Sequence, residues 1–122
     1  MAMDKLIVEV KESVEREYGR AGAKFGLTNH TDHESYAILL EEFQEAKSEF
    51  EFVEKYLEEF WDYVKGDFSV HDKFVCCGDM EKRALLCACE MIQVAAMAKK
   101  AAMTICNRAA LVEVWVQEGG QA

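Results

Sequence analysis

Four glutamates on two separate segments are the residues of this chain whose spacing points most directly to chemistry. Glu41, Glu42 and Glu45 form the pattern Glu-Glu-x-x-Glu, and Glu90 follows after 44 intervening residues. On a helix, Glu45 projects about 40° and Glu42 about 100° from Glu41, so the three carboxylates can converge beside the helix. Hard divalent cations such as Mg²⁺ prefer such oxygen ligands. A Glu-rich strip is also the ordinary solvated face of an amphipathic helix.

Glu90 has unusual surroundings in the sequence. It lies in segment 84–98, in which every other side chain except Gln93 is apolar. A helix that is apolar all round is normally buried, and an isolated carboxylate in such surroundings is protonated or paired. The basic residues of its own segment lie about two turns away or more. We therefore expect Glu90 to share a divalent ion with the acidic cluster, with Lys24 as the alternative, purely structural partner.

Composition limits the class of protein. The chain has 122 residues, 51% of them hydrophobic, and no proline, which favours a single all-α domain over residues 1–122. A net charge of −9 argues against a partner with a phosphate backbone, so no nucleic acid is expected. The apolar run at 84–98 is shorter than a membrane span and contains a glutamate, so no membrane is expected either. Five cysteines, an odd number, indicate reduced thiols in a cytoplasmic protein.

Hydrophobic periodicity predicts three helices. We expect them at residues 4–18, 32–65 and 80–117, with Thr31 or Asp32 capping the second and Asp79 the third. Glycines predict connectors at 19–31 and 66–79. The expected fold is an antiparallel helical bundle of two long helices plus a shorter N-terminal helix.

The third predicted helix has apolar residues on more faces than two partner helices can cover. Surplus apolar surface is usually covered by another subunit, so we expect oligomerisation to complete the bundle, as a homodimer or homotetramer. The residues in question are Leu85, Leu86, Ile92, Val94, Met97, Ile105, Leu111, Val114 and Trp115.

Two segments in this order resemble a known family. Glu41-Glu42-Phe43-Gln44-Glu45, followed by Glu90-Met91-Ile92-Gln93, is similar to the Glu-Glu-x-x-Glu and Glu-x-x-Asp segments of the MazG-like all-α nucleoside triphosphate pyrophosphohydrolases. The stretches Lys24-Phe25-Gly26 and His33-Glu34-Ser35-Tyr36-Ala37 resemble the phage-type branch of that family. The similarity covers about residues 20–105.

The resemblance implies hydrolysis of a nucleoside triphosphate between its α and β phosphates, with Mg²⁺ or Mn²⁺ as the cofactor. On this basis the metal ligands are Glu41, Glu42, Glu45, Glu90 and Gln93. Glu42 is the candidate catalytic residue, because it can accept the proton of the attacking water. Lys24, His33 and Tyr36 are the candidates for contact with the nucleotide, while a helix-capping histidine and a core tyrosine are the structural alternatives.

One departure from the family pattern bears on activity. Gln93 stands where the family has the aspartate of Glu-x-x-Asp, and an amide oxygen brings no charge to a metal. Two other readings therefore stay open. One is a catalytically silent helical oligomer that acts as an interaction or scaffold protein, and the other is a helical regulator that senses redox state through Cys76 and Cys77.

Overall fold

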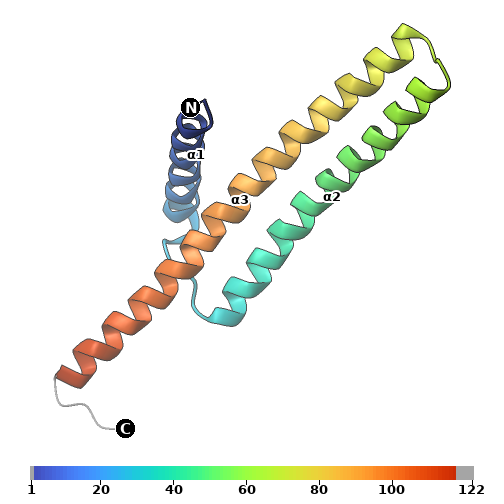
Figure 1. Cartoon of the computed structure of the whole chain (residues 1–122). Coiled ribbons are helices and arrows are strands. Elements are labelled where there is room, and N and C mark those ends of the chain that lie inside the picture. The colour runs from blue at the N-terminus through green and yellow to red at the C-terminus, as the bar shows by residue number, and fades with distance from the viewer. Residues whose placement is uncertain (1, 118–122) are drawn as a thin grey trace. The chain divides into compact units, whose positions relative to one another are not determined.

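The structure is a computed structural model that describes the backbone of residues 2–117 and the side chains of residues 2–109. It contains three α-helices, α1 (Ala2–Phe25), α2 (Asp32–Lys65) and α3 (Val70–Gln117) (Figure 1). No strand occurs in residues 2–117, which confirms the all-α prediction. The predicted end of the third helix at residue 117 agrees with the end of α3.

The chain divides into two compact units, and each is described by itself. Unit 1 combines Met1–Leu40 with Ile92–Ala122, and unit 2 is the continuous segment Glu41–Met91. The prediction of a single domain remains a prediction.

Unit 2 is a helical hairpin of the second part of α2 and the first part of α3. Its cross-helix contacts fix an antiparallel register. The Cys76 thiol donates to the carbonyl of Tyr56 at 3.3 Å, and the Cys87 thiol donates to the carbonyl of Ala46 at 3.6 Å. Residues later in α3 thus contact residues earlier in α2, and within unit 2 the two helices run in opposite directions (Figure 1).

The turn of this hairpin is shorter than the sequence suggested. The predicted connector at 66–79 and the predicted start at residue 80 are wrong, because α3 begins at Val70. The Ser69 hydroxyl accepts a hydrogen bond from the Asp72 backbone N–H at 3.1 Å and caps the helix. Asp67 adopts a positive φ of 53° in the turn, where the Phe68 ring stacks on Tyr63. Asp79 therefore lies inside α3 and is not its cap.

The start of α2 agrees with the prediction. Thr31 accepts a hydrogen bond through its Oγ1 from the Glu34 backbone N–H at 3.0 Å. The Glu34 carboxylate in turn accepts one from the His30 backbone N–H at 3.2 Å. These reciprocal bonds satisfy backbone donors that the first helical turn leaves without partners.

Unit 1 corrects the predicted first helix. The sequence suggested that α1 ends near residue 18, but Gly19 and Gly22 both lie inside the helix, which continues to Phe25. It ends at Gly26, whose φ of 91° suits glycine and whose N–H donates to the Gly22 carbonyl at 2.8 Å. A Cβ on Gly22 would lie only 2.2 Å from Leu27 Cδ2, so this glycine lets the chain fold back over the helix end.

Polar contacts join the parts of unit 1. The Gln93 amide donates to Glu17 Oε1 at 2.7 Å, and Lys99 forms an ion pair with Glu15, so α1 is fixed to α3. In the connector, the Asn29 backbone N–H donates to Thr104 Oγ1 at 2.8 Å.

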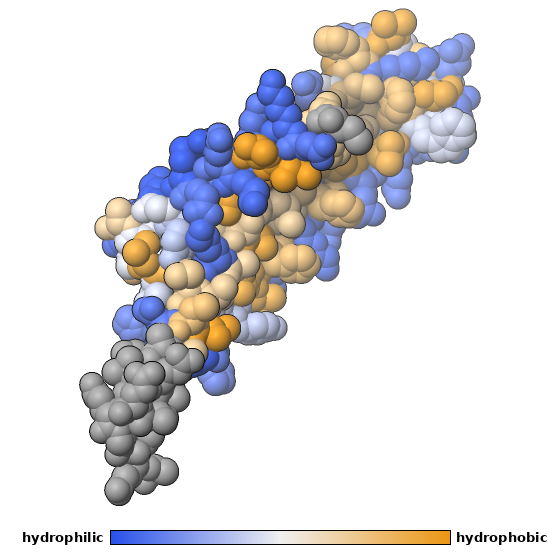
Figure 2. Space-filling view, turned by 60° about the vertical axis from the view of Figure 1, so that its left-hand side comes forward, coloured by the Kyte–Doolittle hydropathy of each residue, from blue (hydrophilic) through white to orange (hydrophobic). Residues whose placement is uncertain are grey.

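Few apolar side chains are buried within one chain. Among the described side chains only Ala46, Cys76 and Ala96 are buried hydrophobic residues, and many large apolar side chains reach the surface (Figure 2). Segment 84–98 was expected to be buried all round, yet Leu85 is 63% and Met91 48% exposed. The expectation that this segment is buried all round is therefore wrong for a single chain, while Glu90 itself is half-buried. No helix within the described residues is long and apolar enough to cross a membrane.

Candidate metal centre

Three of the four glutamates singled out by the sequence meet in unit 2. Glu42 and Glu45 come from α2 and Glu90 from α3, and one carboxylate oxygen of each lies within 4.8 Å of the others. We call this group the carboxylate triad. Glu42 and Glu90 are half-buried and Glu45 is exposed, so the triad is open to solvent on one side.

Helix geometry explains which glutamates meet. Ala46 is 2% exposed and faces α3, where the Cys87 thiol reaches its carbonyl. Around α2, Glu42 lies about 40° from Ala46, Glu45 about 100° and Glu41 about 140°. The exposed Glu41 is accordingly absent from the triad. Glu90 follows Cys87 by three residues, or just under one turn, and comes level with Glu42 and Glu45.

Glu42 is held in an environment that disfavours its charge. Burial raises the pKa of its carboxyl group, and the neighbouring charges of Glu45, Glu90 and Glu41 raise it further. A carboxylate with a raised pKa is a stronger base than an ordinary glutamate. This suits the proton-accepting role that the sequence suggested for Glu42.

Glu90 shows the same effect. Burial raises the pKa of Glu90, as do the charge of Glu45, a hydrogen bond with the Glu45 carboxyl group that favours the protonated form, and the charge of Glu49. The nearby Arg83 is bound to Glu49 at 3.2 Å and lies over the Phe52 ring at 4.0 Å. Burial is thus the first cause of the raised pKa values of Glu42 and Glu90, and repulsion between the carboxylates adds to it; a bound cation would relieve the repulsion.

The oxygen donors of the triad fit a hard divalent cation. Carboxylates are the ligands that Mg²⁺ and Mn²⁺ take from proteins, usually together with water and phosphate oxygens. The triad offers three carboxylates and an open side for a further ligand. Acidic side chains also gather on protein surfaces without an ion, so geometry alone leaves the role of a metal as a proposal.

Gln93, the fifth predicted metal ligand, is engaged elsewhere. It belongs to unit 1, where its side-chain nitrogen donates to Glu17. Hydrogen bonds from Arg20 and Gln93 lower the pKa of Glu17 to about 2. No sequence pattern predicts this contact, because Glu17 and Gln93 are 76 residues apart.

The predicted nucleotide contacts also belong to unit 1. Lys24 lies over the Phe25 ring at 5.1 Å near the end of α1, and His33 lies in the first turn of α2. Tyr36 is 67% exposed, so the alternative of a core tyrosine is wrong for the single chain. Thr31, rather than His33, caps the helix.

An apolar groove lies beside the triad in unit 2. Its volume is about 470 Å³. Phe43, Ala46 and Phe50 line it from α2, and Cys87 and Met91 from α3. The spacing of Phe43 and Phe50, two turns apart with Ala46 between them, is the sequence signal for this groove.

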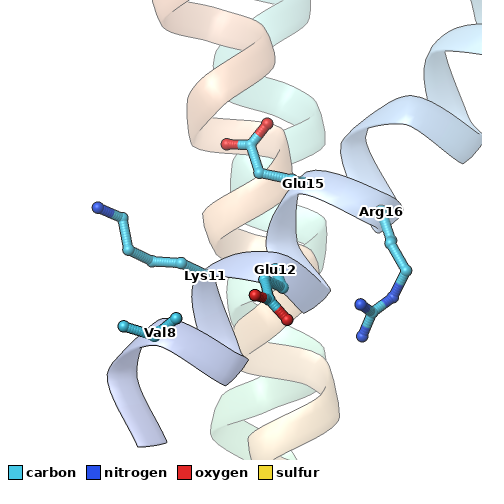
Figure 3. Close-up of a pocket in the computed structure, with 5 residues that line it drawn as sticks. All are labelled: Val8, Lys11, Glu12, Glu15 and Arg16. Atoms are coloured by element: carbon cyan, nitrogen blue, oxygen red, sulfur yellow. The ribbon is translucent and has the colours of Figure 1, made fainter. Parts of the chain in front are cut away.

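Two further hollows are lined mainly by charged and polar side chains. One lies on α1 alone, along Val8, Lys11, Glu12, Glu15 and Arg16, whose charged side chains project from a single helix (Figure 3). The other, of about 140 Å³, lies near the hairpin turn and is lined by Glu59, Tyr63, His71, Asp72, Val75, Cys76 and Asp79.

The cysteines give little support to redox sensing. Cys76 and Cys77 lie within α3, not in a loop as expected, and all five cysteines are free thiols. Burial raises the pKa of the Cys76 thiol, and the charge of Glu59 adds to this effect. Reactive thiols have lowered pKa values, so Cys76 is a structural residue that binds the Tyr56 carbonyl.

Comparison of the chain with protein-family models, with curated proteins and with solved structures finds no match. The features of the chain that bear on its function are therefore the carboxylate triad and the resemblance of its two acidic segments.

Proposed function

We propose that the protein is a divalent-cation-dependent nucleoside triphosphate pyrophosphohydrolase that uses the carboxylate triad. The observation that carries this proposal is the convergence of Glu42, Glu45 and Glu90 from two helices within 4.8 Å. The order of these residues along the chain also resembles that of the acidic segments of the MazG-like family, whereas the 44 residues between Glu45 and Glu90 are more than is typical of that family.

The residues of the triad have distinct roles in this proposal. Glu42, Glu45 and Glu90 hold the cation, which supplies positive charge that offsets the charge of the phosphates. Glu42 accepts a proton as a water oxygen bonds to the α-phosphorus and the bond to the bridging oxygen breaks. The products are the nucleoside monophosphate and pyrophosphate. Burial and neighbouring carboxylates raise the pKa of Glu42 in the cation-free site, and a bound cation would offset this effect by favouring the charged carboxylate.

A pyrophosphate-release screen over ribo- and deoxyribonucleoside triphosphates with Mg²⁺ or Mn²⁺ tests the proposal. We expect release with at least one nucleotide, and loss of at least about 100-fold in Glu42→Gln and Glu90→Gln. Glu58→Gln is the matched control, because Glu58 is an exposed glutamate of α2 outside the triad, and it should keep full activity. Activity that survives both triad substitutions would refute the site assignment.

A catalytically silent helical oligomer is the second candidate function. The exposure of so many large apolar side chains favours it, because such surface commonly marks an interface. A thermal melt separates the two candidates. A cation that binds the native state raises the melting temperature by mass action, whereas a silent scaffold shows no shift with Mg²⁺ or Mn²⁺, with or without a non-hydrolysable nucleotide.

A further inference from the structure

Helix α1 carries one apolar stripe along its whole length, but only half of it is covered. The stripe follows from helical spacing. Its members from the N-terminus onward are Met3, Leu6, Ile7, Val10, Val14, Tyr18 and Ala21. The second half is half-buried in unit 1, where the Tyr18 hydroxyl donates to the Leu27 carbonyl at 2.9 Å.

The first half of the stripe has no such cover. Met3, Leu6, Ile7 and Val10 are between 40% and 57% exposed, and we call these four residues the α1 half-stripe. Their positions correspond to i, i+3, i+4 and i+7. This is the spacing by which an amphipathic helix places its anchors in an apolar groove.

The apolar groove of unit 2 is the matching open surface. Phe43 and Phe50 are 50% and 54% exposed, and Met91 is 48% exposed, so three large side chains of the groove face solvent. Methionine and phenylalanine adapt well to the side chains of an inserted helix.

We propose that the α1 half-stripe of one chain docks in the apolar groove of a second copy, and that the exchange is reciprocal in a two-fold dimer. Both surfaces belong to the same chain, so a closed dimer covers all four of them without any other partner. This inference goes beyond nucleotide hydrolysis and does not depend on it.

Charge favours this pairing over contact between two grooves. Unit 2 has fourteen acidic and six basic side chains, so it carries a net charge of −8, whereas α1 has five of each. Two grooves placed face to face would bring two strongly acidic units together. Docking α1 instead brings a helix of zero net charge to the groove, whose lining includes Glu51 and Glu54 as well as Lys47.

Docking would remove apolar surface from water on both sides of the contact. The four residues of the half-stripe and the three large side chains of the groove are each between 40% and 57% exposed, so both surfaces have apolar area to bury.

The first test compares two substitutions on α1 by sedimentation velocity or light scattering. Ile7→Glu places a charge in the half-stripe and should weaken dimerisation by roughly 10- to 100-fold. Val8→Glu is the matched control, because Val8 is equally exposed but lies on another face of α1, next to Lys11 and Glu12 (Figure 3). This variant should dimerise like the unmodified chain.

The second test uses the groove. Phe50→Glu should weaken dimerisation to a similar degree, whereas Phe74→Glu, at an exposed phenylalanine of unit 2 outside the groove, should leave it unchanged. Far-ultraviolet circular dichroism establishes that each variant keeps its helix content.

Mixing the two monomeric variants decides the matter. The Ile7→Glu chain retains an intact groove and the Phe50→Glu chain an intact half-stripe, so the mixture should form a heterodimer that neither variant forms alone. A monomeric unmodified chain would overturn the proposal, since α1 would then be uncovered or docked within its own chain. Loss of dimerisation in Phe50→Glu but not in Ile7→Glu would also overturn it and indicate contact between two grooves.

Discussion

At the scale of single residues, the burial of Glu90 and its repulsion by neighbouring carboxylates lead to a prediction about how the stability of the fold depends on pH. The folded-state pKa of Glu90 lies above its ordinary value of 4.5, so the native chain binds more protons than the unfolded chain between these two values. Stability therefore falls as pH rises through this window. Glu90→Gln removes the charge, and its melting temperature at pH 7 should exceed that of the unmodified chain by roughly 2–4 °C.

Two further measurements make this prediction specific. Below a pH of about 4.5 the difference between the two proteins should vanish, because Glu90 is then protonated in both the folded and the unfolded state. Added Mg²⁺ or Mn²⁺ should raise the melting temperature of the unmodified chain but not that of Glu90→Gln. A variant that is less stable at pH 7 would show that the triad is not under electrostatic strain.

Gln93 gives a second prediction, in which family resemblance and structure disagree. Gln93→Asp restores the residue of the Glu-x-x-Asp pattern, so the resemblance alone suggests stronger metal binding. The structure instead places Gln93 against Glu17, whose pKa its amide helps to lower to about 2. Aspartate would replace this hydrogen bond with repulsion, and we expect a loss of about 1–2 kcal/mol in the free energy of unfolding at pH 7.

A denaturant titration at pH 7 measures this loss. Gln93→Glu has the length of glutamine and the charge of aspartate, so it should be destabilised as well, while Gln93→Ala should lose only the hydrogen bond. Unchanged stability in Gln93→Asp would mean that the contact with Glu17 contributes nothing in solution.

The meeting of Glu42, Glu45 and Glu90 was predictable from the sequence because it needs only two long antiparallel helices in the right register. The selection among the acidic residues was not predictable. Glu41 fits the sequence pattern as well as Glu42, but it lies about 140° from the α3-facing Ala46 and so points elsewhere. Packing decides which side of α2 faces α3, and the pattern of glutamates alone does not predict that side.

At the scale of helices, the start of α3 allows a direct comparison of sequence and structure. The sequence favoured Asp79 as the cap, whereas the structure shows Ser69 in this role. Ser69→Ala should therefore lower the free energy of unfolding by about 1 kcal/mol, a fall of roughly 3–5 °C in melting temperature. Asp79→Ala, inside the helix, should change it by less than about 0.5 kcal/mol. Thermal melts of the two variants under identical conditions provide the test.

The errors in helix boundaries have a common physical origin. Gly19, Gly22 and Gly78 were interpreted as breaks, because glycine in a helix costs about 1 kcal/mol relative to alanine. Contacts elsewhere in each helix offset that cost. In α3, Cys76 is buried and donates to the Tyr56 carbonyl two residues before Gly78. In α1, Glu15 and Glu17, which precede Gly19, contact Lys99 and Gln93 of α3. Such contacts join residues far apart in sequence, so local pattern could not reveal them.

At the scale of the whole molecule, the sequence predicts surplus apolar surface and the structure leaves many large apolar side chains exposed. The sequence placed the surplus on the third helix, and the structure finds large exposed apolar side chains on all three. The half-stripe was invisible to the sequence because the spacing of α1 is that of an ordinary amphipathic helix. Only the structure shows that its second half is covered and its first half is not.

The acidic character of the chain leads to a last prediction, on the salt dependence of self-association. Each chain carries a net charge of −9, almost all of it in unit 2, so two chains repel each other while their apolar surfaces attract. Salt screens the repulsion, with a Debye length of about 10 Å at 0.1 M and about 3 Å at 1 M, and leaves the apolar contact in place. The dimer dissociation constant should therefore fall several-fold between about 0.05 and 0.5 M NaCl in sedimentation equilibrium. Ile7→Glu should remain largely monomeric at both concentrations, because screening cannot restore a lost apolar anchor. If salt dissociated the unmodified dimer instead, ion pairs rather than the half-stripe and groove would hold the two chains together.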